Sequence, residues 1–299
     1  MRRISWLTDI HLDACSDAGL EALAKDASSL DGCIVITGDL SIGPSLHRHL
    51  ALFAEHAKSP IFFVLGNHDF WYSSIDDVRI TVREACEATG KMQSGESRLT
   101  YLRDSGPIKL SDRTCLVGVD GWCDARAGNL ATPLMMNDFL FIDDLADAMA
   151  PGSVIGWKQG VSRRSLHHKL QALASSETAL LRRKITKALR TKIQPWATQE
   201  KATTFERIVI AMHVPPFVEA TWHEGQHSSD DYLPYFTSLC MGKMLREVAA
   251  ANRKVHFTVL CGHTHGAGVY EVEPNLVVKT GDAMYRWPKV QGNFDVDFV

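Results

Sequence analysis

The sequence predicts an α/β fold built in layers, and three observations support this prediction. Between residues 3 and 90, short apolar runs typical of buried strands alternate with segments whose apolar side chains recur at helical spacing. The chain beyond residue 104 is richer in strand-like segments. Polar and ionisable residues directly follow several apolar runs, at the strand ends where open α/β sheets bind their ligands. Successive β-α units followed by β-rich chain are typical of a layered α/β domain.

The first part of the chain is expected to hold three strands, each followed by a helix. The predicted strands cover residues 3–8, 33–37 and 60–65. The predicted helices cover residues 17–30, 45–57 and 75–89. Gly90 is a suitable stop for the third helix, because glycine readily adopts the conformation that ends helices.

The second part is expected to be less regular. A strand pair is predicted at 108–110 and 114–119, and the region 120–160 is expected to be a loop followed by a helix near 137–149. The longest helical region covers 162–193, where Ser175-Ser176 would divide two apolar stripes. Further strands, a helix and a terminal hairpin are predicted at 206–212, 240–252, 255–261, 270–272 and 276–279. A long polar loop, 217–238, is expected to be functional or mobile, and Tyr285, Arg286 and Trp287 are candidates for the edge of a pocket.

Composition places the chain among ordinary globular proteins. It has 299 residues, of which 45% are hydrophobic, and a net charge of −3, so the chain as a whole is not a polyanion binder. The seven cysteines are scattered and never spaced as CxxC, which favours reduced thiols and a cytoplasmic location. The sequence contains neither a signal-peptide pattern nor an apolar run of about 18 residues that could span a membrane.

One segment departs from this average. From Lys158 to Lys192 there are ten Lys or Arg residues and one acid, Glu177, which gives a local balance of +9. Such a basic helical segment, at about 158–193, could contact nucleic acid or another acidic partner. The favoured alternative is a solvated helix face, because no aromatic residues stand between the charges to stack on bases.

Residues with metal-ligand chemistry follow five of the predicted strands. In order, these motifs are Asp9-x-His11, Gly38-Asp39, Gly66-Asn67-His68-Asp69, His213 and Gly262-His263-Thr264-His265. Asp9 and His11 are two residues apart, so in extended chain their side chains point the same way. Buried side chains of this kind are unfavourable unless they are satisfied, and imidazole with carboxylate suits Mn, Fe or Zn better than Ca or Mg.

Taken together and in this order, the motifs resemble those of the calcineurin-like metallophosphoesterase superfamily, and the resemblance covers Asp9 to His265. It implies one domain over residues 1–299 with a four-layer αββα sandwich of two mixed sheets and flanking helices. It also implies two divalent or trivalent transition-metal ions (Mn, Fe or Zn) that share a hydroxide nucleophile. The first metal would be held by Asp9, His11 and His265, the second by Asn67, His213 and His263, and Asp39 would bridge both.

The same resemblance assigns His68, the remaining imidazole of the motifs, as the general acid that protonates the leaving group. The alternative is that His68 only stabilises the charge of the phosphate. Asp69 is expected to support the site locally rather than to bind metal. Arg126 could clamp a phosphate oxygen, although a surface arginine is the favoured alternative.

Differences between this chain and the motifs of two groups within the superfamily make the activities of those groups less favoured here. Protein Ser/Thr phosphatases of this superfamily have G-D-x-x-D-R-G, whereas here Ile42 and Gly43 stand at the second Asp and the Arg. Leu65 also replaces the Arg before Gly66. The lipid A pathway pyrophosphatases usually have Arg where this chain has His68. Both activities are therefore disfavoured.

The preferred function is hydrolysis of a small phosphomonoester or phosphodiester. The alternative is a nuclease that uses the same site and binds the nucleic-acid backbone through the basic helical segment. A non-catalytic scaffold is disfavoured, because scaffold members of the family have lost some metal ligands, whereas every such position is filled here.

Overall fold

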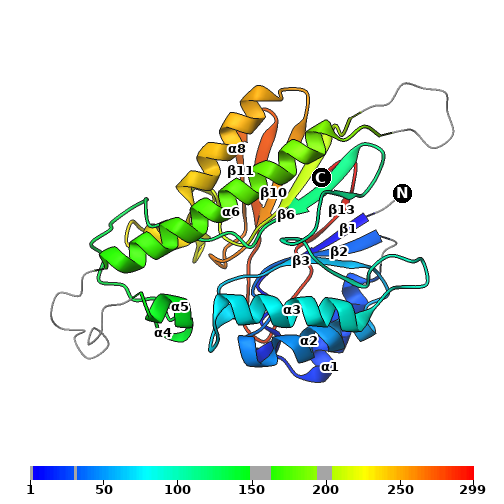
Figure 1. The fold of residues 1–299 in the computed structure, drawn as a ribbon, viewed down its shortest axis with the longest axis horizontal. Helices are drawn as coiled ribbons and strands as arrows, with labels where there is room; N and C mark the ends of the chain where they lie inside the picture. The colour runs from blue at the N-terminus through cyan, green and yellow to red at the C-terminus, as the bar shows by residue number, and fades with distance from the viewer. Residues whose placement is uncertain (1–2, 30–31, 149–162, 194–203) are drawn as a thin grey trace.

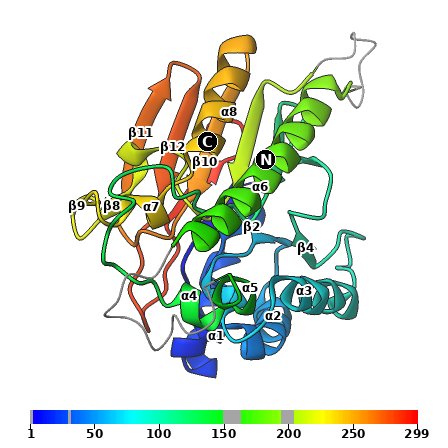
Figure 2. The same cartoon turned by 60° about the vertical axis from the view of Figure 1, so that its left-hand side comes forward.

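Two β-sheets packed face to face form the centre of the molecule, and helices cover the outer face of each sheet (Figure 1). The computed structural model describes residues 3–29, 32–148, 163–193 and 204–299. Figure 2, turned by 60°, shows α1, α2 and α3 on one side of the sheets and α6 and α8 on the other. The four-layer αββα sandwich of two mixed sheets is therefore confirmed.

The first sheet is built mainly by the N-terminal part of the chain. Its strand order is β13 (Gly292–Asp295), β1 (Arg3–Leu7), β2 (Gly32–Thr37), β3 (Ile61–Val64) and β4 (Leu99–Tyr101). Strands β1 to β4 run parallel, and only β13 is antiparallel to its neighbour. The helices beside this sheet are α1 (Asp17–Ala27), α2 (Gly43–His56) and α3 (Ile75–Thr89). Each is a crossover between parallel strands, as the alternating pattern predicts.

The second sheet combines the hairpin after residue 104 with the C-terminal strands. Its order is β11 (Gly268–Glu273), β12 (Leu276–Thr280), β10 (His256–Cys261), β7 (Arg207–Ala211), β6 (Thr114–Gly118) and β5 (Ile108–Lys109). The two predicted hairpins are confirmed, since β5 pairs antiparallel with β6 and β11 with β12. The helices α6 (Arg164–Arg190) and α8 (Leu239–Ala251) cover its outer face.

Alternation of side chains along the strands produces three apolar cores, one for each interface between layers. In β7, Ile208 and Ile210 pack toward α6 and α8, whereas Val209 packs into the core between the sheets. In β2, Ile34 packs toward α1–α3, and Val35 faces the second sheet. Strands buried on both faces read as continuous apolar runs, which explains why they were predictable from sequence.

Some predictions about individual elements were wrong. Helix α6 is continuous through Ser175-Ser176: its first half packs into the core of the first sheet through Leu166 and Leu170, and its second half into the core of the second sheet through Leu181. The helix expected near 137–149 is instead two short helices, α4 (Asp138–Phe141) and α5 (Asp143–Ala146). They are separated by Ile142, whose backbone is extended.

The predicted loop 217–238 is also more ordered than expected. It contains a short 3-10 helix (Val218–Ala220), the two-stranded hairpin β8–β9 (Trp222–His223 and Gln226–His227) and α7 (Leu233–Phe236). The strands β4 and β13 were not predicted. Parts of four predictions lie outside the described residues. These are residue 30 of the first predicted helix, residue 149 of the helix near 137–149, residue 162 of the long helix and residues 158–162 of the basic segment.

Within the ranges that the structure describes, no helix is both long and apolar enough to cross a membrane. All seven cysteines fall in these ranges, and none of them forms a disulfide.

Candidate active site

The polar motifs of the sequence meet where the C-terminal ends of five strands from both sheets come together. β1, β2 and β3 deliver Asp9, Asp39 and Asn67, and β7 and β10 deliver His213 and His263. The first two loops are fixed by the bond from the Asp9 amide to the Gly38 carbonyl, 3.0 Å long. Across the sheets, Nδ1 of His213 lies 2.9 Å from the carbonyl oxygen of Thr37. The two halves of the site are therefore joined by direct hydrogen bonds.

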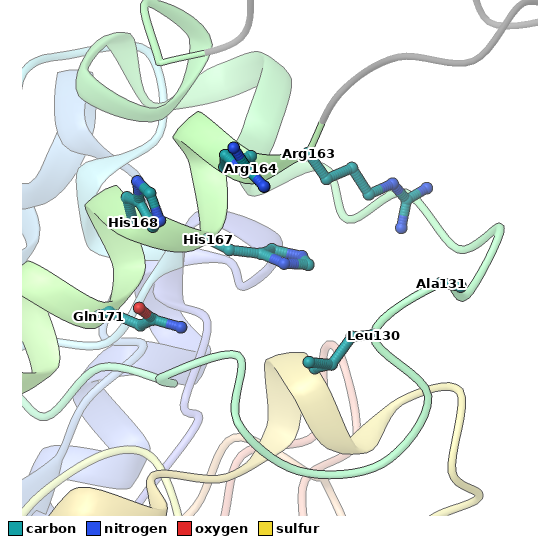
Figure 3. A pocket seen from close by; sticks show the side chains of 7 residues that line it. All are labelled: Leu130, Ala131, Arg163, Arg164, His167, His168 and Gln171. Carbon is teal, nitrogen blue, oxygen red and sulfur yellow. The ribbon is translucent and has the colours of Figure 1, made fainter.

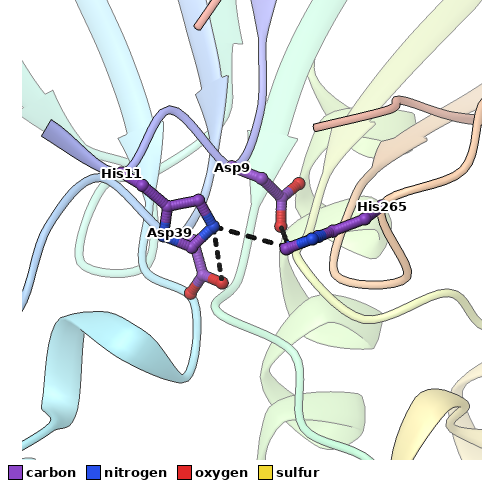
Figure 4. Close-up of side chains that lie close together, drawn as sticks. All are labelled: Asp9, His11, Asp39 and His265. Carbon is purple, nitrogen blue, oxygen red and sulfur yellow. Dashed lines mark hydrogen bonds and ion pairs between the residues drawn. The ribbon is translucent and has the colours of Figure 1, made fainter. Parts of the chain in front are cut away.

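The first group of donor atoms consists of Asp9, His11, Asp39 and His265, which converge from separate loops (Figure 4). One ligand atom from each residue lies within 4.8 Å of every other. The Nε2 atoms of His11 and His265 are 3.4 Å apart, and Nε2 of His265 is 3.5 Å from Oδ1 of Asp9. Oδ2 of Asp39 is 3.9 Å from Nε2 of His11. A single cation could contact all four groups.

The second group lies on the other side of Asp39 and consists of Asn67, His213 and His263. Oδ1 of Asn67 is 3.0 Å from Nε2 of His213 and 2.9 Å from Nδ1 of His263. The other carboxylate oxygen of Asp39, Oδ1, is 3.4 Å from Nε2 of His213. Asp39 thus presents one oxygen to each group of donors.

Hydrogen bonds on the far side of two imidazoles orient their lone pairs into the site. Nδ1 of His213 faces the carbonyl of Thr37, and Nε2 of His263 lies 2.9 Å from the carbonyl oxygen of Tyr235. A nitrogen that faces a carbonyl carries the hydrogen, so in the neutral ring the other nitrogen offers a lone pair. Both lone pairs then point at the amide oxygen of Asn67, which is itself an acceptor. Such a set of facing acceptors fits a bound cation, and the outward bonds are those typical of metal-binding histidines.

The pKa values of the site differ between the two imidazoles: the carboxylates favour a protonated ring at His213, whereas burial favours a neutral ring at His263. Burial lowers the pKa of His213, but the carboxylates of Asp39 and Asp9 outweigh it and raise this pKa to about 10. Burial tends to raise the pKa of Asp39, yet the rings of His213 and His68 hold it well below the ordinary value. Burial lowers the pKa of His263 to about 4, which keeps that ring neutral and able to bind a metal.

The backbone of the site is strained. Asp9, His11, Asp39, His263 and His265 all have positive φ angles, between 40° and 71°, and they are five of the nine non-glycine residues with this conformation among those described. Residues other than glycine rarely adopt positive φ angles, and such backbone strain is concentrated at functional sites.

Two glycines of the motifs allow side chains to approach the backbone closely. A Cβ atom at Gly66 would collide with the carboxylate of Asp39, and one at Gly262 would collide with the carboxylate of Asp9 and the hydroxyl of Thr8. Any larger residue at Gly66 or Gly262 would therefore displace a carboxylate of the site.

His68 lies beside the donor groups without belonging to either. Its amide donates to Oδ1 of Asp39 over 2.9 Å, and its Nε2 is 4.0 Å from Oδ2 of the same carboxylate. The imidazole stacks on the indole of Trp71, with ring centroids 3.6 Å apart and an interplanar angle of 25°. Burial lowers the pKa of His68 to about 4, so the ring is neutral near pH 7.

Two further residues singled out in the sequence lie outside the donor groups. Asp69 accepts hydrogen bonds from the amides of Ser41 and Gly66, both 2.8 Å long, and so supports the loops locally as expected. Arg126 contacts the carboxylate of Asp124 at 3.2 Å and is not among the residues that line the pocket over the site. The surface alternative for Arg126 thus agrees with the structure.

A pocket of about 240 Å³ opens over the donor groups. Its lining comprises Asp39, Asn67, His68, Trp71, Met136, Asn137, Asp138, His223, Phe236, His263, Thr264, His265 and Tyr285. Tyr285 was expected at a pocket edge, whereas Trp71 and Asp138 were missed. Oδ1 of Asp138 accepts from Nδ2 of Asn67 over 2.9 Å and from Nε1 of Trp71 over 2.7 Å. Asp138 lies at the start of the helix expected near 137–149, but nothing in the sequence assigned a role in the site to its carboxylate.

A second hollow, of about 530 Å³, lies beside the start of α6 (Figure 3). It is lined by Leu130, Ala131, Arg163, Arg164, His167, His168 and Gln171. Nη1 of Arg163 contacts the hydroxyl of Tyr235 at 2.9 Å, and the carbonyl of Tyr235 is the partner of His263. One tyrosine thus separates this basic hollow from the donor groups.

Comparison with known proteins gives a consistent result. The family model described as calcineurin-like phosphoesterase matches residues 2–267. No protein of curated function matches the sequence significantly. The fold is similar to a phosphopantetheinyl hydrolase from Mycobacterium tuberculosis, with a TM-score of 0.54, 11% identity, and 96% of this chain and 95% of that chain covered. It is also similar to a dimetal phosphatase from Danio rerio, with a TM-score of 0.47, 12% identity, and 95% and 88% of the two chains covered.

Proposed function

The chain belongs to the calcineurin-like phosphoesterase family and is a metal-dependent phosphoesterase, and from this premise we propose that it hydrolyses a small phosphate ester at the pocket over the two donor groups. The observation that carries the proposal is the convergence of seven potential ligands from both sheets. We propose that Asp9, His11 and His265 hold one metal ion and Asn67, His213 and His263 a second, while Asp39 bridges them. Residues 1–299 would form one catalytic domain, since both sheets contribute ligands.

The donor chemistry favours manganese, iron or zinc, because the set combines four imidazoles with carboxylates and one amide oxygen. When bound, two such ions would lower the pKa of a shared water and polarise the phosphoryl oxygens. The protein contributes the orientation of the ligands: backbone carbonyls fix His213 and His263, and Asp138 fixes the amide of Asn67.

His68 is proposed to protonate the leaving oxygen. Its ring lines the pocket and is held in place by the stack on Trp71, so it can face the ester without binding metal. Burial keeps the free ring neutral, but the negative charge of a bound ester favours the protonated imidazole. The alternative role, charge stabilisation of the phosphate alone, requires only the N–H donor.

The size of the pocket supports a small substrate, as does the absence of lysine and arginine from its described lining. The nuclease alternative receives little support from α6. Lys169 pairs with Asp144 at 2.8 Å, Arg182 pairs with Glu247, and the ammonium group of Lys184 is buried against backbone carbonyls. These three cations of the basic segment are already engaged within the protein. The cytoplasmic location is kept as a proposal, because the seven cysteines are scattered along the sequence and never spaced as CxxC.

The proposal is tested by loading the purified protein with Mn, Fe or Zn and assaying p-nitrophenyl phosphate and its bis ester, with elemental analysis in parallel. We expect about two metal ions per chain and turnover of at least one ester. The variant Asp39→Ala should lose metal as well as activity, because both donor groups share this carboxylate. Retention of two metals in Asp39→Ala would contradict the bridging role.

A further inference from the structure

The pocket over the donor groups differs from a site built for a doubly charged phosphate. Among its described lining residues there is no lysine or arginine. Arg126 is paired with Asp124, and the side chain of Arg286, which follows Tyr285, is exposed outside the lining. Enzymes commonly bind phosphate groups through arginine forks or lysine charges. Here the chain itself offers imidazoles, amides and the hydroxyl groups of Thr264 and Tyr285 to the phosphate, but no lysine or arginine charge from the described lining.

The lining also contains a carboxylate beyond those of the proposed metal ligands. Asp138 is buried, lines the pocket and receives two hydrogen bonds, from Asn67 and Trp71, on one oxygen. Two divalent ions would bring four positive charges, which the carboxylates of Asp9, Asp39 and Asp138 and a hydroxide would balance. A phosphate monoester carries close to two negative charges at neutral pH, whereas a diester carries one.

Aromatic rings stand on both sides of the donor groups. Beside the first group, the ring centroid of Tyr285 lies 4.4 Å from that of His11 and 5.5 Å from that of His265. Beside the second group, the ring centroid of Phe236 lies 5.2 Å from that of His263. An ester bound between the groups would therefore meet an apolar surface at each side of its phosphorus, which suits a phosphate with two organic substituents.

We propose that this site selects phosphodiesters, singly charged phosphates with an uncharged organic group on each side, over phosphomonoesters. The inference rests on the proposed function and specifies its substrate class. The residues that set the preference are Asp138, by its charge, and Tyr285 and Phe236, by the rings they present.

The first test compares kcat/KM for bis(p-nitrophenyl) phosphate and p-nitrophenyl phosphate on the metal-loaded protein, since the two esters share a leaving group. We expect the diester to be preferred at least about tenfold, as one unit charge at close range is sufficient for such a factor. If the monoester is turned over equally well or better, the inference is wrong and the proposed function stands. If a protein with two metals turns over neither ester, the proposed function fails and the inference fails with it.

A gain of charge provides a sharper test. Asn137 lies at the lip of the pocket, is exposed, and makes no side-chain capping bond to α4. Asn137→Arg should therefore fold normally and shift the ratio of the two kcat/KM values toward the monoester by about tenfold. Asn137→Gln, which extends the side chain without adding charge, should leave the ratio unchanged. An equal shift in both variants would overturn the role of charge.

A binding measurement avoids dependence on turnover. By titration calorimetry with the metal-loaded protein, the monoanionic monoethyl ester of phenylphosphonate should bind more tightly than phenylphosphonate itself at a pH where the latter is a dianion. Asp138→Asn keeps an oxygen acceptor for Asn67 and Trp71, and it should reduce this difference. Tighter binding of the dianion by the unmodified protein would contradict the proposal.

Discussion

His68 shows how a single side chain can be placed beside a candidate metal site without belonging to either group of donors. Its amide is anchored to Asp39, and its ring is held beside the donor groups by the stack on Trp71, with Nε2 4.0 Å from Oδ2 of Asp39. Trp71 in turn donates its indole N–H to Asp138. In protein phosphatases of the superfamily a carboxylate orients this histidine, and here the corresponding position holds Ile42. The aromatic stack supplies a different means of fixing the ring.

The role of His68 leads to a specific prediction. His68→Ala should leave the metal content near that of the unmodified protein, because the ring is not among the proposed metal ligands, and should lower kcat by about 10²–10⁴-fold. The measurement is the turnover of an ester with a poor leaving group, together with elemental analysis. An ester with a good leaving group should be affected less, since it needs no proton. Equal losses for both esters would assign His68 to charge stabilisation instead.

The motifs were visible in the sequence because they are local, whereas the residues that support them are not. Asn67 and His68 follow an apolar strand directly, so their position at a strand end could be predicted. Asp138 reaches Asn67 from a segment 71 residues away in sequence, through a short helix that begins at Asp138 itself. The sequence predicts a helix near 137–149, but only tertiary structure brings the start of this segment to the site.

At the scale of elements, α6 connects the two halves of the sandwich through a buried cluster of charges. Oε1 of Glu177 lies 2.9 Å from Nε of Arg103 and 3.3 Å from an Nη atom of Arg79. Arg79 also contacts Oδ2 of Asp120 at 2.9 Å, and the backbone amide of Leu65 donates to Oδ1 of Asp120. The two arginines and two acids balance in charge, and the cluster ends at the strand that precedes Gly66.

We predict that Glu177→Gln destabilises the protein by about 3 kcal/mol, because it removes a buried negative charge that pairs with the buried guanidinium of Arg79 and the partly buried guanidinium of Arg103. The free energy of unfolding in urea measures this effect. A matched control is Glu247→Gln. Glu247 lies in α8 and pairs with Arg182 of α6 in an exposed position. That variant should change stability by less than about 1 kcal/mol. Similar values for the two variants would show that the buried cluster has no special importance.

The basic segment illustrates what charge counting can and cannot predict. The count of +9 was correct as arithmetic, but it treated Glu177 and Lys184 as surface groups. In the folded chain both are buried, and burial lowers the pKa of Lys184 to about 8. Helical periodicity located α6 well, because apolar spacing reports burial of a face. It could not identify the charges that a second element would cover.

At the scale of the whole molecule, the candidate metal centre lies across the seam between the sheets. Asp9, Asp39 and Asn67 come from the first sheet, whereas His213 and His263 come from the second. The layering itself followed from the family resemblance rather than from periodicity. The edge strands β4 and β13 were missed because each has only three or four residues, too few for an alternating pattern to stand out.

Ligands drawn from both sheets imply that metal binding and folding are linked. A metal that binds only the folded chain adds about 2.7 kcal/mol when its free concentration is a hundred times the dissociation constant. For a chain of this size we expect chelation to lower Tm by about 5–10 °C. Scanning calorimetry of the metal-loaded and chelator-treated protein measures the shift. Asp39→Ala is the control, because a protein that cannot hold the metals should unfold at the same temperature with and without chelator. A Tm of the unmodified protein that is independent of metal would mean that the two sheets hold these side chains together without any ion.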